Sequence, residues 1–247
     1  GDAAEVWPKL PPGGTYSALV PNEKGLERAV EVGVKRIALF TAASDAFTLK
    51  NINRTVEDSL QEFEKVVESF RAAVSNGFVR GYVSTAFQCP YAGKIPVEKV
   101  LAVCRRLSQI GVDELSIGDT IGAASPVEVR ELGKAIAVEF SVDKVAMHFH
   151  DTHGTAIANV AAALELGFAT FDSSAAGLGG CPYAPGAAGN LATDDLVYFL
   201  ERQGIPTGVD REKLAKASLP ILQALGRPPQ AKAQLAELAS GGSPNRQ

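Results

Sequence analysis

Apolar positions recur along the chain with two different spacings, and the change of spacing separates predicted strands from predicted helices. Short runs of apolar or β-branched residues predict strands at 16–20, 36–40, 79–85, 114–117, 145–150 and 170–173. Helical spacing predicts helices at 23–32, 55–76, 96–110, 126–139, 154–166 and 193–203. A strand–helix rhythm with such short connections requires parallel strands joined by crossovers. The pattern therefore predicts an α/β protein.

Helix starts and helix ends carry their own signals. Thr55 with Asp58, and Ser125 with Glu128, have the spacing of capping boxes and predict two helix starts. A glycine has no Cβ and readily takes the left-handed conformation that ends a helix. This predicts helix ends at Gly33, Gly77, Gly111, Gly167 and Gly204.

The two ends of the chain depart from this rhythm. Residues 1–14 contain three prolines without usable periodicity, so we expect an irregular segment. Residues 210–239 predict two helices separated by Gly226-Arg-Pro-Pro, with no partner strand. We interpret 1–247 as a single domain, with six β/α units at 15–203 and C-terminal helices and a tail at 204–247.

Composition narrows the classes of molecule that we expect the protein to bind. A formal net charge of −4 and a pI near 5.5 argue against a nucleic-acid or anionic-membrane surface and favour a small-molecule substrate. No stretch approaches the ~20 apolar residues of a membrane span. Three cysteines are too few for a disulfide framework, which indicates a reducing compartment. The chain does not begin with methionine and shows no signal-peptide pattern, so we expect that Gly1 is not the natural start.

Two histidines near the end of the fifth predicted strand are the clearest chemical signal. His148 and His150 are two residues apart, a spacing that turns both side chains to one face of a strand. They predict a metal site at the carboxyl ends of the strands, although a hydrogen-bonded core histidine is the simpler alternative. Asp151 and His153 are out of that register and are typical of supporting or helix-start residues. Oxygen ligands nearby favour Mg²⁺ or Mn²⁺, with Zn²⁺ as an alternative.

Other candidates follow the strands. Cys181 lies in a glycine-rich loop, where an exposed thiol favours proton transfer or nucleophilic attack, although a buried loop cysteine is the alternative. Cys104 falls on the apolar stripe of its helix and is expected in the core. The role of Cys89, before Pro90, stays open. Asn190 and Asp119 also have simpler interpretations, as a helix cap and a turn residue respectively.

Several motifs together resemble one family. LSIGDTIG at 115–122, HFHDTHG at 148–154 and GLGGCPYAPGAAGN at 177–190 are similar to the 3-hydroxy-3-methylglutaryl-CoA lyases of the DRE-TIM metallolyase superfamily, and the resemblance covers about 16–225. It implies a TIM (β/α)₈ barrel. It also implies a lyase of ketone body formation and leucine degradation, which cleaves 3-hydroxy-3-methylglutaryl-CoA to acetyl-CoA and acetoacetate by a retro-Claisen reaction.

The resemblance assigns roles to individual residues. It implies that His148, His150 and Asn190 hold Mg²⁺ or Mn²⁺, that Cys181 is the catalytic acid, and that Lys50 and Asn51 contact the coenzyme A portion of the substrate. His148 and Asp119 are further expected catalytic residues. The resemblance also implies a homodimer, located in the cytoplasm if the source is bacterial and in the mitochondrial matrix if it is eukaryotic.

One family motif is missing. The family takes a metal-binding aspartate and an arginine from an Arg-Asp-Gly motif on its first strand, and the sequence contains no such motif. We therefore expect that the first two β/α units of the barrel are absent and that these 247 residues alone have little or no activity. The alternatives are a non-catalytic isoform or remnant, and a related synthase that condenses acetyl-CoA with a 2-oxo acid.

Overall fold

A parallel sheet of six strands forms the centre of the computed structural model, which describes residues 2–179 and 189–241. The strand order is β1-β2-β3-β6-β7-β8, and all five neighbouring pairs are parallel. The strands are β1 (Ala18–Leu19), β2 (Arg36–Ala42), β3 (Phe78–Ser84), β6 (Glu114–Asp119), β7 (Val145–Phe149) and β8 (Thr170–Asp172). This confirms the predicted α/β architecture and all six predicted strand positions.

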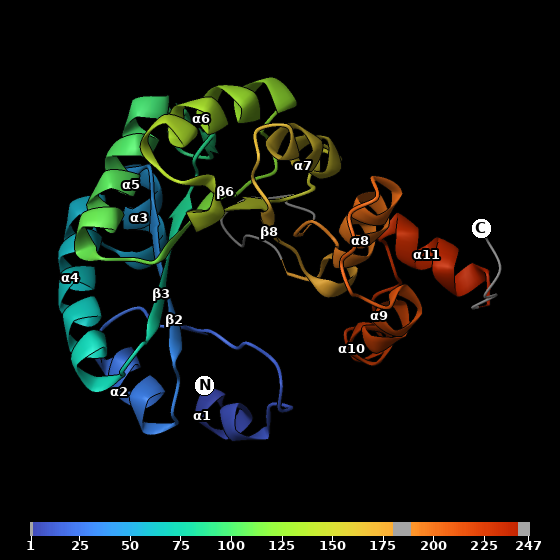
Figure 1. Cartoon of the computed structure of the whole chain (residues 1–247), viewed down its shortest axis with the longest axis horizontal. Coiled ribbons are helices and arrows are strands. Elements are labelled where there is room, and N and C mark those ends of the chain that lie inside the picture. Colours follow the sequence, from blue (N-terminus) through green and yellow to red (C-terminus); the bar gives the residue numbers. More distant parts are fainter. Residues whose placement is uncertain (1, 180–188, 242–247) are drawn as a thin grey trace.

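Helices connect the strands and cover one side of the sheet. They are α2 (Glu23–Glu31), α4 (Val56–Ala73), α5 (Val97–Ile110), α6 (Pro126–Glu139), α7 (Ala156–Leu164) and α8 (Thr193–Arg202). Figure 1 shows α4, α5 and α6 along the outer side of the curved sheet, with α7 beside them. Their apolar stripes bury residues such as Phe70, Leu107 and Ile136 against the strands.

The helix starts predicted at Thr55 and Ser125 are confirmed, whereas the helix predicted at 55–76 ends at Ala73. The Thr55 hydroxyl accepts a bond from the Asp58 amide and the Asp58 carboxylate accepts one from the Thr55 amide, and Ser125 with Glu128 does the same at α6. At the end of α4, however, Asn76 and not Gly77 takes the left-handed conformation, with φ of 56°. Gly77 is needed for space, because a Cβ there would lie 2.5 Å from the Phe70 ring.

Several elements were not predicted. The N-terminal segment contains the short helix α1 (Ala3–Val6) and a 3₁₀ turn at Trp7–Lys9, and the loop after β2 contains α3 (Asp45–Ile52). A small antiparallel hairpin, β4 (Gln88–Cys89) and β5 (Gly93–Lys94), follows β3. The C-terminal part has three helices where two were predicted: α9 (Arg211–Ala217), α10 (Leu219–Ala224) and α11 (Lys232–Ala239). Pro220, near the start of α10, permits a new helix but not continuation of the previous one.

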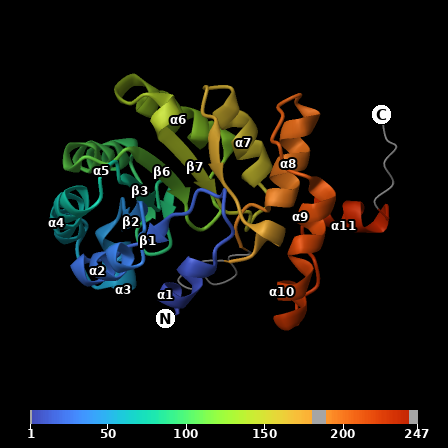
Figure 2. The same cartoon turned by 60° about the horizontal axis from the view of Figure 1, so that its bottom comes forward.

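The sheet has two edges. β1 and β8 are its outermost strands, and no strand pairing joins them within residues 2–179 and 189–241. Figure 2 shows the strands side by side, with the helices α8, α9, α10 and α11 beyond α7 and away from the α2 side of the molecule. No helix in the described part of the chain is long and apolar enough to cross a membrane.

Candidate metal centre

His148 and His150 lie next to each other at the carboxyl end of β7. Their ring centroids are 5.3 Å apart, with an angle of 52° between the ring planes. His148 is within β7 and His150 directly follows it, so the alternation of the strand turns both imidazoles to the same face. The structure thus brings the two histidines together as the spacing predicts.

A backbone bridge brings Asn190 to the same place. His150 and Asn190 form an isolated antiparallel bridge, flanked by bonds from the Leu191 amide to the Phe149 carbonyl (3.0 Å) and from the Asp151 amide to the Gly189 carbonyl (3.2 Å). Directly paired residues in such a bridge project their side chains to one face, about 5 Å apart at Cβ. The bridge therefore sets the Asn190 amide beside the imidazole pair.

The orientation of the Asn190 side chain leaves an oxygen for a ligand. Its Nδ2 donates to the Leu178 carbonyl at 3.0 Å, and its Oδ1 accepts no hydrogen bond from the described residues. Gly179, at φ of +97°, makes this approach possible, because a Cβ there would lie 2.6 Å from the Asn190 Nδ2. Gly189 is as tightly placed, since its Cβ would lie 2.3 Å from the Gly177 carbonyl oxygen.

His150 is a buried imidazole with an unused nitrogen. The residue is 6% exposed, and its Nδ1 is buried with no hydrogen-bond partner among the described residues. Burial, together with the neighbouring His148, lowers the pKa of His150 to about 4, so the ring is neutral at pH 7. A neutral imidazole has a lone pair that suits a metal ion, and an unpartnered buried nitrogen fits such a role.

His148 is held by residues that the sequence analysis did not single out. Its Nδ1 lies 3.2 Å from Asp172 Oδ2, and the same carboxylate binds Arg80 Nη1 (2.7 Å) and Ser116 Oγ (3.0 Å). Burial raises the pKa of Asp172, but the His148 hydrogen bond and the Arg80 charge outweigh it and hold the pKa below its usual value. The sequence feature that could have indicated these contacts is a charged residue, Arg80, in the interior of a mainly apolar strand.

Asp119 lies on the other side of the sheet from the histidines. It pairs in register with Phe149, whose side chain projects opposite to that of His148. Its carboxylate accepts bonds from the Ala123 amide (3.0 Å) and the Ala124 amide (3.1 Å), and burial raises its pKa to about 6. Asp119 is thus the last residue of β6, and its carboxylate holds the loop before α6. Its catalytic role stays a prediction.

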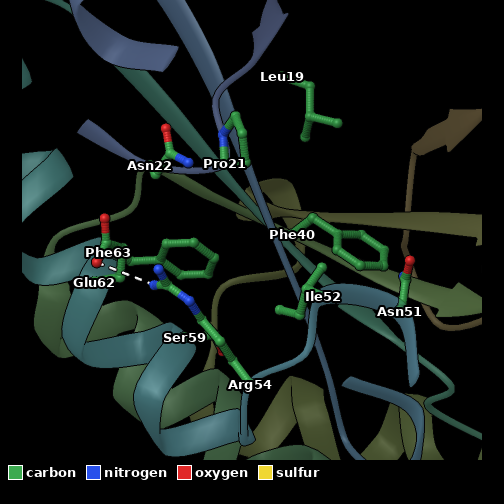
Figure 3. A pocket seen from close by; sticks show the side chains of 10 residues that line it. All are labelled: Leu19, Pro21, Asn22, Phe40, Asn51, Ile52, Arg54, Ser59, Glu62 and Phe63. Atoms are coloured by element: carbon green, nitrogen blue, oxygen red, sulfur yellow. Dashed lines mark hydrogen bonds and ion pairs between the residues drawn. The ribbon is translucent and has the colours of Figure 1, made fainter. Parts of the chain in front are cut away.

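Lys50 and Asn51 are on the last turn of α3. Asn51 lines a cavity of about 490 Å³ between β1, β2, α3 and α4, while Lys50 is exposed and does not line it. Figure 3 shows Phe40, Ile52 and Phe63 in this cavity, with the Arg54–Glu62 ion pair (3.0 Å) at its side. His148, His150 and Asn190 are not among the lining residues. Contact of Lys50 and Asn51 with coenzyme A stays a prediction.

The remaining candidates fall into three groups. Cys181 lies outside the described residues. Cys104 is buried in the core as predicted, where burial raises its pKa to about 12, and Cys89 is also buried, with its sulfur accepting a bond from Ser44 Oγ (3.2 Å). Asp151 accepts a bond from the Ala156 amide and so starts α7, while His153 Nδ1 donates to the Gly122 carbonyl at 2.8 Å.

The candidate ligands that the described part of the chain brings together are His148, His150 and Asn190. Within residues 2–179 and 189–241, no three His, Cys, Asp or Glu side chains gather closely enough to hold a metal ion. The ligands that do converge are two imidazoles and one amide oxygen. Such a set suits a divalent cation that completes its coordination with further oxygens.

Comparison with known proteins places this geometry in a family context. The HMGL-like family model matches residues 10–221. A hydroxymethylglutaryl-CoA lyase of Bacillus subtilis is 46% identical over 216 residues, which cover 87% of this chain and 72% of that protein. The mitochondrial hydroxymethylglutaryl-CoA lyase of Bos taurus is 50% identical over 216 residues, which cover 87% of this chain and 66% of that protein.

Solved structures agree with the sequence matches. The hydroxymethylglutaryl-CoA lyase of Pseudomonas aeruginosa matches with a TM-score of 0.92 and 46% identity, covering 97% of this chain and 80% of that chain. An HMG-CoA lyase of Acinetobacter baumannii in complex with coenzyme A and 3-methylmalate matches with a TM-score of 0.89 and 34% identity, covering 98% and 78%. The chain spans 66% to 77% of the lengths of the curated relatives it matches.

Proposed function

The chain belongs to the HMGL-like family, and on that premise we propose that it cleaves 3-hydroxy-3-methylglutaryl-CoA to acetyl-CoA and acetoacetate. Its parallel sheet has the arrangement of the TIM-barrel lyases that it matches. The observation that supports the proposal is the backbone bridge between His150 and Asn190, which brings the Asn190 residue to the two imidazoles at the carboxyl end of β7. Ligand sites in parallel α/β folds lie at this end of the strands.

Members of this lyase family depend on a divalent metal ion. We propose Mg²⁺ or Mn²⁺ for this chain, with the imidazoles of His148 and His150 and the Asn190 Oδ1 as the ligands that it contributes. The neutral His150 ring supports this assignment, as does the Asn190 Oδ1, which accepts no hydrogen bond from the described residues. When bound, such an ion supplies Lewis-acid chemistry that lowers the pKa of the substrate hydroxyl on C3.

The reaction then needs two proton transfers and one bond cleavage. A general base takes the proton of the C3 hydroxyl as the C2–C3 bond breaks. C3 becomes the ketone of acetoacetate, and the bonding electrons pass into the thioester enolate of acetyl-CoA. We propose that the Cys181 thiol donates a proton to C2 of that enolate. We propose that Asp119 contributes by holding the loop before α6, because both of its carboxylate oxygens bind amides of that loop.

Further proposals concern partners and location. The Acinetobacter baumannii relative was solved with coenzyme A, which supports an acyl-CoA substrate, bound in part by Lys50 and Asn51. We also propose a homodimer. For the compartment we propose the cytoplasm if the source is a bacterium and the mitochondrial matrix if it is a eukaryote; the name of the bovine relative describes it as mitochondrial.

The decisive assay measures acetoacetate and acetyl-CoA after incubation with 3-hydroxy-3-methylglutaryl-CoA and Mg²⁺ or Mn²⁺. We expect equal amounts of both products from a version extended by an N-terminal segment with an Arg-Asp-Gly motif, and little from the 247 residues alone. Absence of both products from the extended version would contradict the proposal.

A Cys181→Ala variant of the extended version separates the lyase from the synthase alternative. We expect it to lose cleavage and to keep its affinity for Mn²⁺, because the thiol supplies a proton and not a ligand. Cleavage at an undiminished rate would favour the synthase alternative, although the named relatives are lyases.

A further inference from the structure

A row of polar side chains from four neighbouring strands lies on the same face of the sheet as His148. The register pairs Arg80 with Glu114, Tyr82 with Ser116, and His148 with Asp172. Because side chains alternate along each strand, all six of these residues project to one face. The side chains of Arg80, Glu114 and Asp172 are each only 17% exposed, and charged side chains are seldom so far buried unless they are paired. The row of polar side chains across β3, β6, β7 and β8 therefore calls for an explanation.

We propose that Asp172, fixed by Arg80 and Ser116, is a positioning residue that sets the tautomer and ring orientation of His148. The proposal deepens the metal-dependent function proposed above and rests on it. Asp172 accepts the Nδ1–H of His148, so the other ring nitrogen, Nε2, keeps its lone pair. A carboxylate bonded to the far nitrogen of a metal-binding histidine holds the ring in place and strengthens it as a ligand.

The carboxylate is itself held from two sides. Arg80 Nη1 binds Asp172 Oδ1 at 2.7 Å, while Ser116 Oγ donates to Oδ2 at 3.0 Å. Both oxygens thus have a partner other than His148. The Asp172 side chain is 17% exposed, and a carboxylate with these contacts has little freedom to rotate away from the ring.

Arg80 has further partners besides Asp172. Its guanidinium pairs with Glu114 and donates to the Tyr82 hydroxyl at 2.9 Å. The Tyr82 ring in turn packs edge-on against His148, with centroids 6.0 Å apart. Through the contacts of its Nε and Nη1 with Glu114, Tyr82 and Asp172, Arg80 acts on the histidine by way of these residues.

The simpler alternative is an ion pair that only joins strands. Asp113 offers a matched case, since its carboxylate binds Arg71 at 2.7 Å and the Val79 amide at 2.7 Å, next to the amino end of β6. Both aspartates pair with an arginine across the fold, but only Asp172 contacts a histidine. Comparing Asp172→Asn with Asp113→Asn therefore separates positioning from general stabilisation.

The first experiment uses the metal-free full chain labelled with ¹⁵N, at pH 8, where an ordinary imidazole is neutral. Long-range ¹H–¹⁵N correlation shows which ring nitrogen of each of the three histidines carries the proton, with a His148→Gln variant assigning the signals. We expect the Nδ1–H tautomer at His148 in the wild type and in Asp113→Asn, and its loss in Asp172→Asn. An Nε2–H tautomer at His148 in the wild type, or an unchanged tautomer in Asp172→Asn, would overturn the proposal.

The second experiment measures Mn²⁺ affinity of the same chains by electron paramagnetic resonance. We expect Asp172→Asn to weaken binding about 10- to 100-fold and Asp113→Asn to leave it within about twofold. Equal losses in both variants, or none in Asp172→Asn, would overturn the proposal. If a His148→Ala variant binds Mn²⁺ as the wild type does, the proposed metal ligands themselves are wrong. The tautomer result, which needs no metal, then still decides the role of Asp172.

Discussion

At the scale of single residues, two buried groups near the end of β7 respond to pH in opposite ways. Burial lowers the pKa of His150 to about 4, so its contribution to stability is present above the ordinary histidine pKa of about 6.5 and is lost as the pH falls. Burial raises the pKa of Asp119 to about 6, so its contribution is present below the ordinary value of about 3.9 and is lost as the pH rises. The two effects partly cancel between pH 4 and 6.

The contribution of His150 can be isolated with a variant. Between pH 7.5 and 5.0 the unfolded state takes up a proton that the folded state refuses, which lowers the free energy of unfolding by about 2 kcal/mol. We expect His150→Gln to remove this part of the pH dependence, because glutamine does not titrate. Urea unfolding of the metal-free chain at the two pH values measures the difference.

The wild-type chain, unfolded with urea at the same two pH values, is the reference for this measurement. If His150→Gln and the wild type lose the same free energy between pH 7.5 and 5.0, His150 does not have the lowered pKa.

At the scale of elements, the segment around Asn190 depends on glycines whose place a side chain cannot take. Gly179→Ala would drive a methyl group toward the Asn190 Nδ2, at 2.6 Å, in addition to straining a backbone at φ of +97°. We expect this variant to bind Mn²⁺ about tenfold more weakly, because the amide must turn away from the histidines. The measurement is Mn²⁺ titration followed by electron paramagnetic resonance.

Gly33→Ala separates the contact from the backbone strain. Gly33 has φ of +78°, and a Cβ there meets nothing within 4 Å. We expect this variant to lose about 1 kcal/mol of stability, as left-handed alanine does, without a change in Mn²⁺ affinity. A similar loss of affinity in both variants would show that strain, and not contact with Asn190, controls the site.

The elements themselves were largely predictable from the sequence, because strand and helix periods differ and capping residues mark boundaries. α3 was missed, since Ala46, Phe47, Leu49 and Ile52 form no continuous apolar stripe. The histidine pair was predictable from a spacing of two residues. Asp172 was not connected to His148, because that contact depends on the register between two strands, and neither local spacing nor composition encodes it.

At the scale of the whole molecule, the edge formed by β1 is a site for unwanted association. β1 has only two residues, and Leu19 in it is 66% exposed beside the cavity lined by Phe40 and Ile52. Exposed strand edges with apolar side chains favour aggregation. We expect Leu19→Lys to slow aggregation of the concentrated chain, as followed by light scattering, and to change the free energy of unfolding by less than about 0.5 kcal/mol.

Leu225, which is 54% exposed at the end of α10, provides the comparison. Leu225→Lys adds the same charge at a position outside the sheet, so it should slow aggregation less. If both substitutions slow aggregation equally, net charge and not the edge of the sheet controls the rate of aggregation.

The ion pair between Arg80 and Asp172 also determines the stage of folding at which the proposed metal centre can form. The two residues are 92 positions apart in the sequence. Such a long-range contact forms late in folding, only when β8 has paired with β7. A chain folded as far as β7 has both histidines but neither the carboxylate that orients His148 nor the bridge to Asn190. We therefore expect a metal ion bound at the proposed centre to stabilise the finished sheet and not its partly folded precursors.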